Sequence, residues 1–411
     1  MSAAVATRPT AFPAATTSAA PADPRRTPML TVDLGAVAHN TRLLADRAGT
    51  ATLMAVVKAD GFGLGATAVA RTALAHGATR LGVTSLQEAL ALRAAGVHAP
   101  VLSWLNAVDA PWDAALAADV DVAVPSQEHL HAVVAAAHAT GRTARVHLHL
   151  DTGLARDGAE PHAWADLCRA ARRAELRGAV RVAGVMGHLA RADEPADPAN
   201  ADGRARFAWG VAVACATGLR PRLRHLAATA ATLTDPASRH TMVRIGAGLA
   251  GIDPSGTTTL ADPVTLTAPV VTVRRVPAGT PVGYGGTWTT TRASRLALLP
   301  VGYADGLPRL ASGAAEVLLR GRRVPVVGRV SMDQVVLDLG PADATGPLAS
   351  VAPGDVGTVI GPDHAAPTVA DWAAWSGLLP HEVLTGLGHR PHRVVLPAPA
   401  PTPVPALRSL A

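Results

Sequence analysis

Short runs of β-branched and other apolar residues alternate with longer Ala- and Leu-rich stretches of helical period between about residues 30 and 265. This alternation is typical of βαβ units, in which a helix connects each parallel strand to the next. The eight expected strands lie at residues 53–58, 81–85, 101–104, 121–124, 145–151, 180–188, 222–227 and 242–246. Eight such units in succession predict a (β/α)8 TIM barrel.

The pattern changes beyond about residue 266, where helical stretches nearly vanish and segments such as PVVTVRRV and RRVPVVGRV alternate with Gly- and Pro-containing turns. This pattern indicates a β-rich domain. The expected fold class is therefore α/β, with an N-terminal TIM barrel over 29–265 and a C-terminal β-rich domain over 266–396. Residues 1–28, rich in Ala, Pro, Thr and Ser, are predicted to be disordered, and residues 397–411 to be a flexible tail.

Composition narrows the class of protein. The chain has 411 residues, 49% of them apolar, which suffices for two domain cores. It has neither an apolar stretch of about 20 residues nor a secretory signal, so we expect a soluble, cytoplasmic protein without membrane partners. The net charge of +6 comes from scattered arginines, which argues against nucleic-acid binding. Cys168 and Cys215 match no metal-ligand spacing, and no metal is expected.

Lysine occurs once, at position 58, among 37 lysines and arginines. A lysine amine can lose its proton and condense with a carbonyl, whereas an arginine guanidinium stays protonated and is a poor nucleophile. Taken alone, a single lysine also fits survival by chance. Its position adds weight, because Lys58 ends the first expected barrel strand, and TIM-barrel active sites lie at the carboxyl ends of the strands. Asp151, His188 and Gly246 fall at other such ends.

The segment AVVKADGFGLGA at residues 55–66 resembles the lysine motif of the alanine racemase family, which is dependent on pyridoxal 5'-phosphate (PLP) and has fold type III. Further segments resemble family motifs in order and spacing, from about residue 30 to 394: LGVTSLQEALALRAAG, LDTGLARDG, GVMGHLARAD, HLAATAA, VRIGAGLAGIDPS, VGYGGTW, LPVGYADGLPR, VVGRVSMDQ and HEVLTGLGHRPHR. The resemblance implies an isomerase that interconverts L- and D-alanine, with PLP bound to Lys58 as a Schiff base.

The resemblance also implies two bases on opposite faces of the cofactor, Lys58 and Tyr284. One base would remove the α-proton of the amino acid, and the other would return a proton from the far face. In the family the tyrosine comes from the second domain of the partner subunit. A homodimer with Tyr284 contributed across the interface is therefore implied.

Other cofactor and substrate contacts follow from the resemblance. Arg244 matches the arginine that faces the pyridine nitrogen, and because guanidinium only donates, it should leave that nitrogen unprotonated. His188 is placed at the cofactor, where it could favour the phenolate of the tyrosine base. Arg156 matches the arginine beside the substrate carboxylate. The remaining expected positions hold the phosphate or contact the substrate at its entrance: Thr229, Gly246 and Ala247, then Tyr303 and Met332.

Several positions depart from the family pattern. Phe62 and His381 stand where tyrosines usually lie beside the phosphate, so two hydroxyl donors are missing or replaced. Ala228 and Ala250 replace a usual asparagine and tyrosine, which leaves extra room. His149 replaces a lysine that many members carry in carbamylated form, and with no second lysine that carbamate cannot form.

These departures leave alternatives open. A racemase of serine or of a larger amino acid would use the room at Ala228 and Ala250. A non-catalytic PLP-binding homologue would follow from a weakened phosphate site. A basic amino-acid decarboxylase is disfavoured by Arg244, because those enzymes carry a carboxylate at that position.

Overall fold

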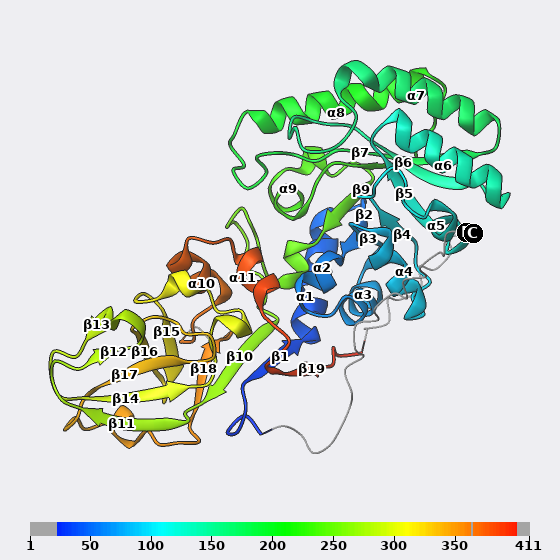
Figure 1. The fold of residues 1–411 in the computed structure, drawn as a ribbon. Helices are drawn as coiled ribbons and strands as arrows, with labels where there is room; N and C mark the ends of the chain where they lie inside the picture. The colour runs from blue at the N-terminus through cyan, green and yellow to red at the C-terminus, as the bar shows by residue number, and fades with distance from the viewer. Residues whose placement is uncertain (1–22, 363–364, 401–411) are drawn as a thin grey trace, which may run out of the picture.

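A computed structural model describes residues 23–362 and 365–400 of the chain. Figure 1 shows a barrel surrounded by helices and, beside it, a smaller domain built mainly of strands. The expected fold class, a TIM barrel followed by a β-rich domain, is confirmed. The tails expected at 1–28 and 397–411 lie largely outside the described residues.

All eight expected barrel strands are present. They form one parallel sheet in the order β8-β7-β6-β5-β4-β3-β2-β9. Their bounds are β2 (Thr52–Val56), β3 (Ala78–Val83), β4 (Val101–Ser103), β5 (Val120–Val124), β6 (Ala144–His149), β7 (Val180–Met186), β8 (Leu223–His225) and β9 (Met242–Ile245). Between β8 and β9, the amides of Thr241 and Arg244 donate to the carbonyls of Arg224 and Ala227, over 3.2 and 3.0 Å. The barrel is therefore nearly closed.

Helices cover the outside of the barrel (Figure 1). They are α1 (Leu34–Ala48), α3 (Ala66–Ala75), α4 (Leu86–Ala94), α5 (Trp112–Ala117), α6 (Gln127–Thr140), α7 (Pro161–Leu176), α8 (Ala199–Ala216) and α9 (Thr229–Thr234). Local sequence explains several starts, since the side chains of Asp33, Ser85 and Ser126 accept hydrogen bonds from the first turns of α1, α4 and α6. A glycine lets α8 approach the segment that follows β6 closely, because a Cβ at Gly210 would lie 2.3 Å from the side chain of Leu150.

The second domain contains a nine-stranded sheet in the order β11-β14-β17-β16-β15-β18-β10-β1-β19. The strands are β1 (Met29–Asp33), β10 (Val264–Pro269), β11 (Thr272–Val276), β14 (Ser294–Leu299), β15 (Glu316–Leu319), β16 (Arg322–Val327), β17 (Val335–Pro341), β18 (Val356–Ile360) and β19 (His392–Leu396). A hairpin of β12 (Pro281–Val282) and β13 (Trp288–Thr289) and two helices, α10 (Val369–Ser376) and α11 (Pro380–Gly386), complete the domain.

Strand β1 joins the nine-stranded sheet, although its residues precede the barrel in the chain. Strand β1, counted with the barrel, pairs antiparallel with β10 and parallel with β19. Its residues 29–33 therefore belong to the sheet of the second domain, and so does 264–265 at the start of β10. The alternating burial of Leu30 and Val32 fits a strand of either domain, so only the pairing assigns it.

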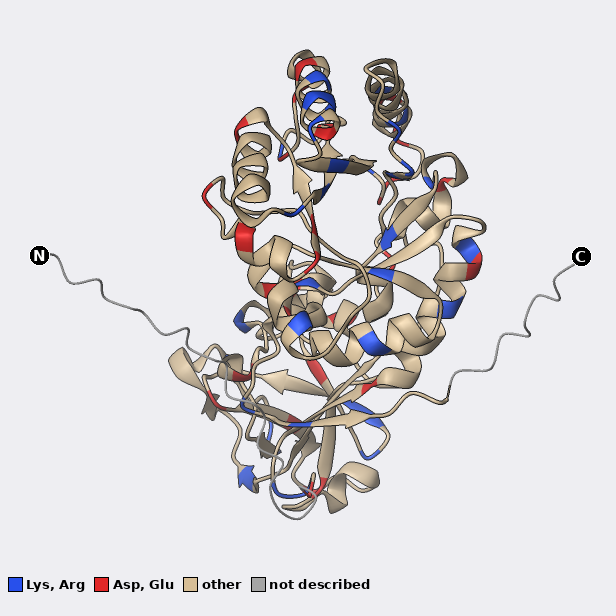
Figure 2. Cartoon of the chain, turned by 90° about the vertical axis from the view of Figure 1, so that its right-hand side faces the viewer, with Lys and Arg blue, Asp and Glu red and all other residues tan. Residues whose placement is uncertain are grey.

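In the cartoon of Figure 2, the positions of Lys and Arg alternate along the chain with those of Asp and Glu and are scattered over both domains. Among the described residues, no helix is long and apolar enough to cross a membrane. Within the same residues, no group of three or more His, Cys, Asp or Glu side chains could hold a metal ion.

Candidate active site

Lys58 lies at the carboxyl end of β2, as the first residue of the short segment α2 (Lys58–Phe62). The segment is a left-handed turn, with φ of 51° at Ala59, 52° at Asp60 and 61° at Phe62. Such a conformation costs about 1–2 kcal/mol for each non-glycine residue. Hydrogen bonds hold it: the amide of Ala59 donates to Glu88 over 2.7 Å, and Asp60 accepts from the amide of Ala66 over 2.8 Å. The backbone that carries Lys58 is therefore firmly placed.

The amine of Lys58 is partly desolvated. Burial lowers its pKa below the ordinary lysine value, the nearby guanidinium of Arg156 lowers it further, and Glu88 opposes both effects. A lowered pKa leaves more of the amine neutral at physiological pH. The neutral amine is the form that condenses with a carbonyl group, so the structure favours the chemistry expected for Lys58.

Arg244, in β9 next to β2, is buried and makes a dense set of contacts. Its NH1 group donates to the carbonyl of His225 over 2.7 Å and contacts Nδ1 of the same residue at 3.0 Å. Its NH2 group donates to the carbonyl of Gly187 over 2.7 Å and to Nδ1 of His188 over 3.1 Å. Burial, followed by repulsion from Arg156, lowers the pKa of Arg244 to about 10. The guanidinium thus remains charged at neutral pH and is rigidly oriented.

His188 follows β7 and is a neutral imidazole. Burial, followed by the positive charge of Arg244, lowers its pKa to about 3. Because Arg244 donates to Nδ1, the ring proton must reside on Nε2. His188 can therefore act on a neighbouring group only as a hydrogen-bond donor at Nε2, and it supplies no positive charge.

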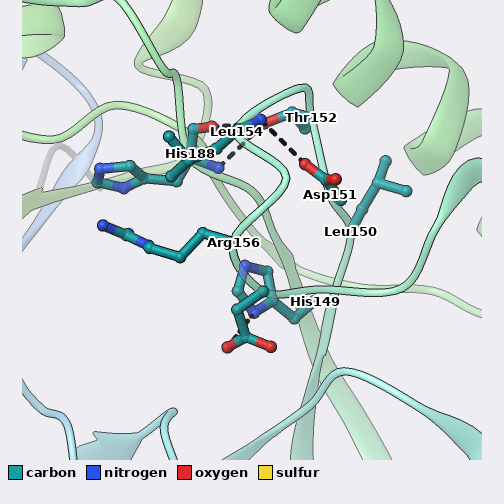
Figure 3. A pocket seen from close by; sticks show the side chains of 8 residues that line it. His149, Leu150, Asp151, Thr152, Leu154, Arg156 and His188 are labelled. Atoms are coloured by element: carbon teal, nitrogen blue, oxygen red, sulfur yellow. Dashed lines mark hydrogen bonds and ion pairs between the residues drawn. The ribbon is translucent and has the colours of Figure 1, made fainter.

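The loop after β6 carries Arg156. Asp151 shapes this loop, since one of its carboxylate oxygens accepts hydrogen bonds from the amides of Gly153, Leu154 and Ala155. Figure 3 shows Arg156 extended beside the ring of His188, while His149 lies on the other side of Arg156. The acidic residue next to His149 is Asp157, whose carboxylate lies 3.4 Å from Nδ1 of His149. A histidine–aspartate contact thus stands where the family resemblance led us to expect a carbamylated lysine.

A further part of the site lies between α2, α9 and the turn after β9, where the phosphate-binding residues are expected. The hydroxyl of Thr229 accepts from the amide of Gly248 over 3.1 Å. Phe62 packs against Gly246, where a Cβ would lie 2.9 Å from the phenyl ring. Helix α11 of the second domain brings His381 to this place, and its buried Nδ1 has no hydrogen-bond partner among the described residues.

Three expected residues lie apart from this cluster. Tyr284, Tyr303 and Met332 belong to the second domain and are 73%, 40% and 52% exposed. Among the described residues, no hydrogen bond joins their side chains to the barrel. Tyr303 and Met332 lie next to each other, because the amide of Tyr303 donates to Ser331 and that of Ala304 to Met332.

Sequence reasoning missed two groups of residues. Arg390 forms a fork with Asp305, at 2.6 Å from each carboxylate oxygen, and also binds Asp333. This cluster ties together the segments of Tyr303 and Met332, which gives Asp333 a structural role. The second group is His225 and its neighbours behind Arg244. His225 is the first residue of the HLAATAA motif and lies within the strand expected at 222–227, and the motif was the only sequence signal that pointed to it.

Comparison with known proteins identifies the family of the chain. Residues 32–254 match the model of the alanine racemase N-terminal domain, and residues 263–395 match that of the C-terminal domain. Alanine racemase from Frankia casuarinae is 46% identical over 372 residues, covering 89% of this chain and 95% of the relative. That from Mycobacterium tuberculosis is 46% identical over 358 residues, covering 86% and 92%.

Solved structures lead to the same family. Alanine racemase from Streptomyces lavendulae superposes with a TM-score of 0.86 at 40% identity, covering 90% of this chain and 97% of the other. The Streptomyces coelicolor enzyme has a TM-score of 0.85 at 42% identity, with coverage of 90% and 98%. The Bartonella henselae enzyme, solved with covalently bound pyridoxal phosphate, has a TM-score of 0.81 at 26% identity and covers 90% and 99%. The resemblance expected from the motifs is confirmed, and the chain belongs to the alanine racemase family.

Proposed function

We propose that this protein interconverts L- and D-alanine with PLP held by Lys58. The observation that carries the proposal is the placement of the only lysine of the chain. Lys58 lies at the carboxyl end of a barrel strand, and its pKa is lowered by burial and by Arg156. On the neighbouring strand Arg244 is fixed by hydrogen bonds to His225 and His188.

The residues present suit PLP. Arg244 would face the pyridine nitrogen as a donor, while Thr229 and the backbone at 246–247 would face the phosphate. The unpartnered Nδ1 of His381 offers a further donor to the phosphate in its Nδ1–H form. PLP, when bound, withdraws electrons from the substrate and makes its α-proton more acidic.

Proton transfer is assigned to Lys58 and Tyr284. With its pKa lowered, the amine of Lys58 can accept and return a proton on one face of the substrate. Tyr284 would serve the other face from the partner subunit of a homodimer. Its 73% exposure in the single chain supports an interface position, since an exposed aromatic side chain is often covered by a partner.

Substrate binding is assigned to Arg156, Tyr303 and Met332. Arg156 has no ion pair with an acidic side chain within the described residues, so its guanidinium is available for a carboxylate. Tyr303 and Met332 would reach the entrance from the partner. Of the two positions expected to leave room, Ala250 is 3% exposed and Ala228 is partly exposed. The relatives named above favour alanine over serine or a larger amino acid.

The proposal is tested by incubating the PLP-supplemented protein with L-alanine, L-serine and L-arginine and following the D-enantiomers by chiral chromatography. We expect alanine to be converted fastest. A protein that shows the visible absorbance of bound PLP but leaves alanine optically unchanged would contradict the substrate assignment. Absence of that absorbance even at high PLP concentration would contradict the cofactor assignment.

A further inference from the structure

A row of buried polar side chains runs through the barrel interior behind Arg244. Nδ1 of His225 lies 3.0 Å from NH1 of Arg244, and Nε2 of His225 lies 2.9 Å from Nδ1 of His147. Nε2 of His147 lies 3.6 Å from Oδ2 of Asp121, longer than a good hydrogen bond but within the range of an ion pair. The row joins β9, β8, β6 and β5, strands that only the barrel brings together.

Asp121, at the end of the row away from Arg244, carries a fixed negative charge. Oδ1 of Asp121 accepts from Nε of Arg145 over 2.6 Å, and Oδ2 accepts from Arg80 over 3.2 Å. Burial raises the pKa of Asp121, but His147 and Arg145 outweigh it and hold the pKa below its ordinary value. Asp121 is therefore a carboxylate, which can accept hydrogen bonds but cannot donate one.

The Arg244 end fixes the direction of the two hydrogen bonds in the row, which join Arg244 to His225 and His225 to His147. Arg244 can only donate, so Nδ1 of His225 must be the acceptor. In a neutral His225 the proton then lies on Nε2, which donates to Nδ1 of His147. His147 in turn carries its proton on Nε2, directed at Asp121. If His225 carried its proton on Nδ1 instead, that N–H would face an N–H of the Arg244 guanidinium, and neither group could accept a hydrogen bond.

The surroundings make this arrangement costly to disturb. Apolar side chains, including Met54 and Met242, form a buried cluster inside the same barrel. An unpaired polar group in such surroundings is strongly disfavoured. The backbone also makes room for the row, since a Cβ at Gly184 would lie 2.6 Å from Nδ1 of His147.

We propose that His147 and Asp121 are positioning residues for Arg244. They hold His225 as the Nε2–H tautomer, so that its Nδ1 accepts from Arg244 and fixes the guanidinium as a donor toward the cofactor ring. The role of the Arg244 guanidinium as a donor toward the cofactor ring rests on the proposed function. The tautomer of His225 does not, because it follows from contacts within the chain alone.

The first test uses the cofactor-free protein labelled with 15N-histidine. His225 signals are assigned by their loss in His225→Gln. We expect an unprotonated Nδ1 and a protonated Nε2 in the wild-type protein. A proton on Nδ1 of His225 would overturn the proposal, and the protonation state itself is read in the wild-type protein.

The second test compares Asp121→Asn and His147→Phe with Asp355→Asn, which breaks an aspartate–arginine pair far from the row, in the second domain. We expect changed His225 signals in the first two variants alone. In the PLP-loaded enzyme kcat should fall about tenfold with KM nearly unchanged, as for other residues that orient a catalytic group through a neighbour. The visible spectrum of bound PLP should shift as well.

His147→Asn is the conservative variant, since its amide oxygen can still accept from His225 and should restore much of the rate. Folded Asp121→Asn and His147→Phe proteins with wild-type His225 signals and wild-type kcat would refute the positioning role. If the tautomer is as expected but no variant, nor the wild type, racemises alanine, the proposed function fails while the arrangement of the row stands.

Discussion

The imidazole of His381 and the phenyl ring of Phe62 lie 6.1 Å apart between centroids, at an interplanar angle of 49°. His381 belongs to α11 of the second domain and Phe62 to α2 of the barrel, so this contact joins the domains beside Lys58. Both positions usually hold tyrosine in the family. Burial, followed by the charge of Lys58, lowers the pKa of His381, which is therefore neutral at physiological pH.

Replacing His381 by Phe should weaken the binding of PLP. The change removes the unpartnered Nδ1, and one hydrogen bond to a charged group contributes about 1.5–3 kcal/mol, or about 10- to 150-fold in affinity. Titration of the apoprotein followed by visible absorbance measures the effect. Phe62→Tyr, which adds a hydroxyl beside His381, should strengthen the binding of PLP. Equal affinities of the wild-type, His381→Phe and Phe62→Tyr proteins for PLP would show that His381 does not contact the phosphate.

Replacing Lys58 by Arg should abolish covalent attachment of PLP while keeping the positive charge. Because the chain has no second lysine, borohydride reduction should then give no PLP-modified lysine peptide at all. Racemisation should fall by at least about a thousandfold, since a nucleophile and a base are both lost. Arg47→Lys, on the exposed side of α1, is the matched control: it adds a surface lysine, and the modified peptide should still be the one that contains Lys58.

The dimer assignment predicts complementation between two inactive variants. In a mixed dimer of Lys58→Arg and Tyr284→Phe, one site carries both changes and the other carries neither. Racemase activity should therefore appear when the two proteins are dissociated and reassembled together, toward a quarter of the wild-type value for random pairing in equal amounts. Continued inactivity of a verified mixed dimer would show that both residues act within one subunit.

Stability should decline at acidic pH because of His188. Its pKa in the folded protein is about 3, below the ordinary value of 6.5, so the unfolded chain binds one more proton between these values. The free energy of unfolding should be fully retained above about pH 6.5 and fall as the pH decreases toward 3. Burial lowers the pKa of His225 as well, and it adds to the same slope.

Urea unfolding at a series of pH values measures this dependence. His188→Gln should give a shallower decline than the wild-type protein, since one of the groups that must stay neutral has been removed. His162→Gln is the control, because the His162 side chain is 79% exposed. Identical pH profiles for His188→Gln and the wild-type protein would contradict the neutral state assigned to His188.

The sequence predicted the barrel well because the pattern that marks a parallel strand is local. Each of the eight expected strands has a counterpart, and Lys58 follows the carboxyl end of β2 as expected, beside the strand that carries Arg244. The sequence alone showed that Lys58 is the single lysine of the chain and that Arg244 lies in a family motif. The family assignment likewise depended only on the order of motifs along the chain.

The strand partners of β1 and the protonation of the buried histidines depended on contacts between segments that are distant in the chain. Strand β1 has an ordinary alternating pattern, and only its pairing with β10 and β19 places it in the second domain. Asp121 began an apolar strand segment, and nothing in the chain order connects it with His147 or His225. The closure of the barrel sets these side chains beside one another in a water-poor interior, where unpaired polar groups are costly, and that burial decides which nitrogen of each ring carries its proton.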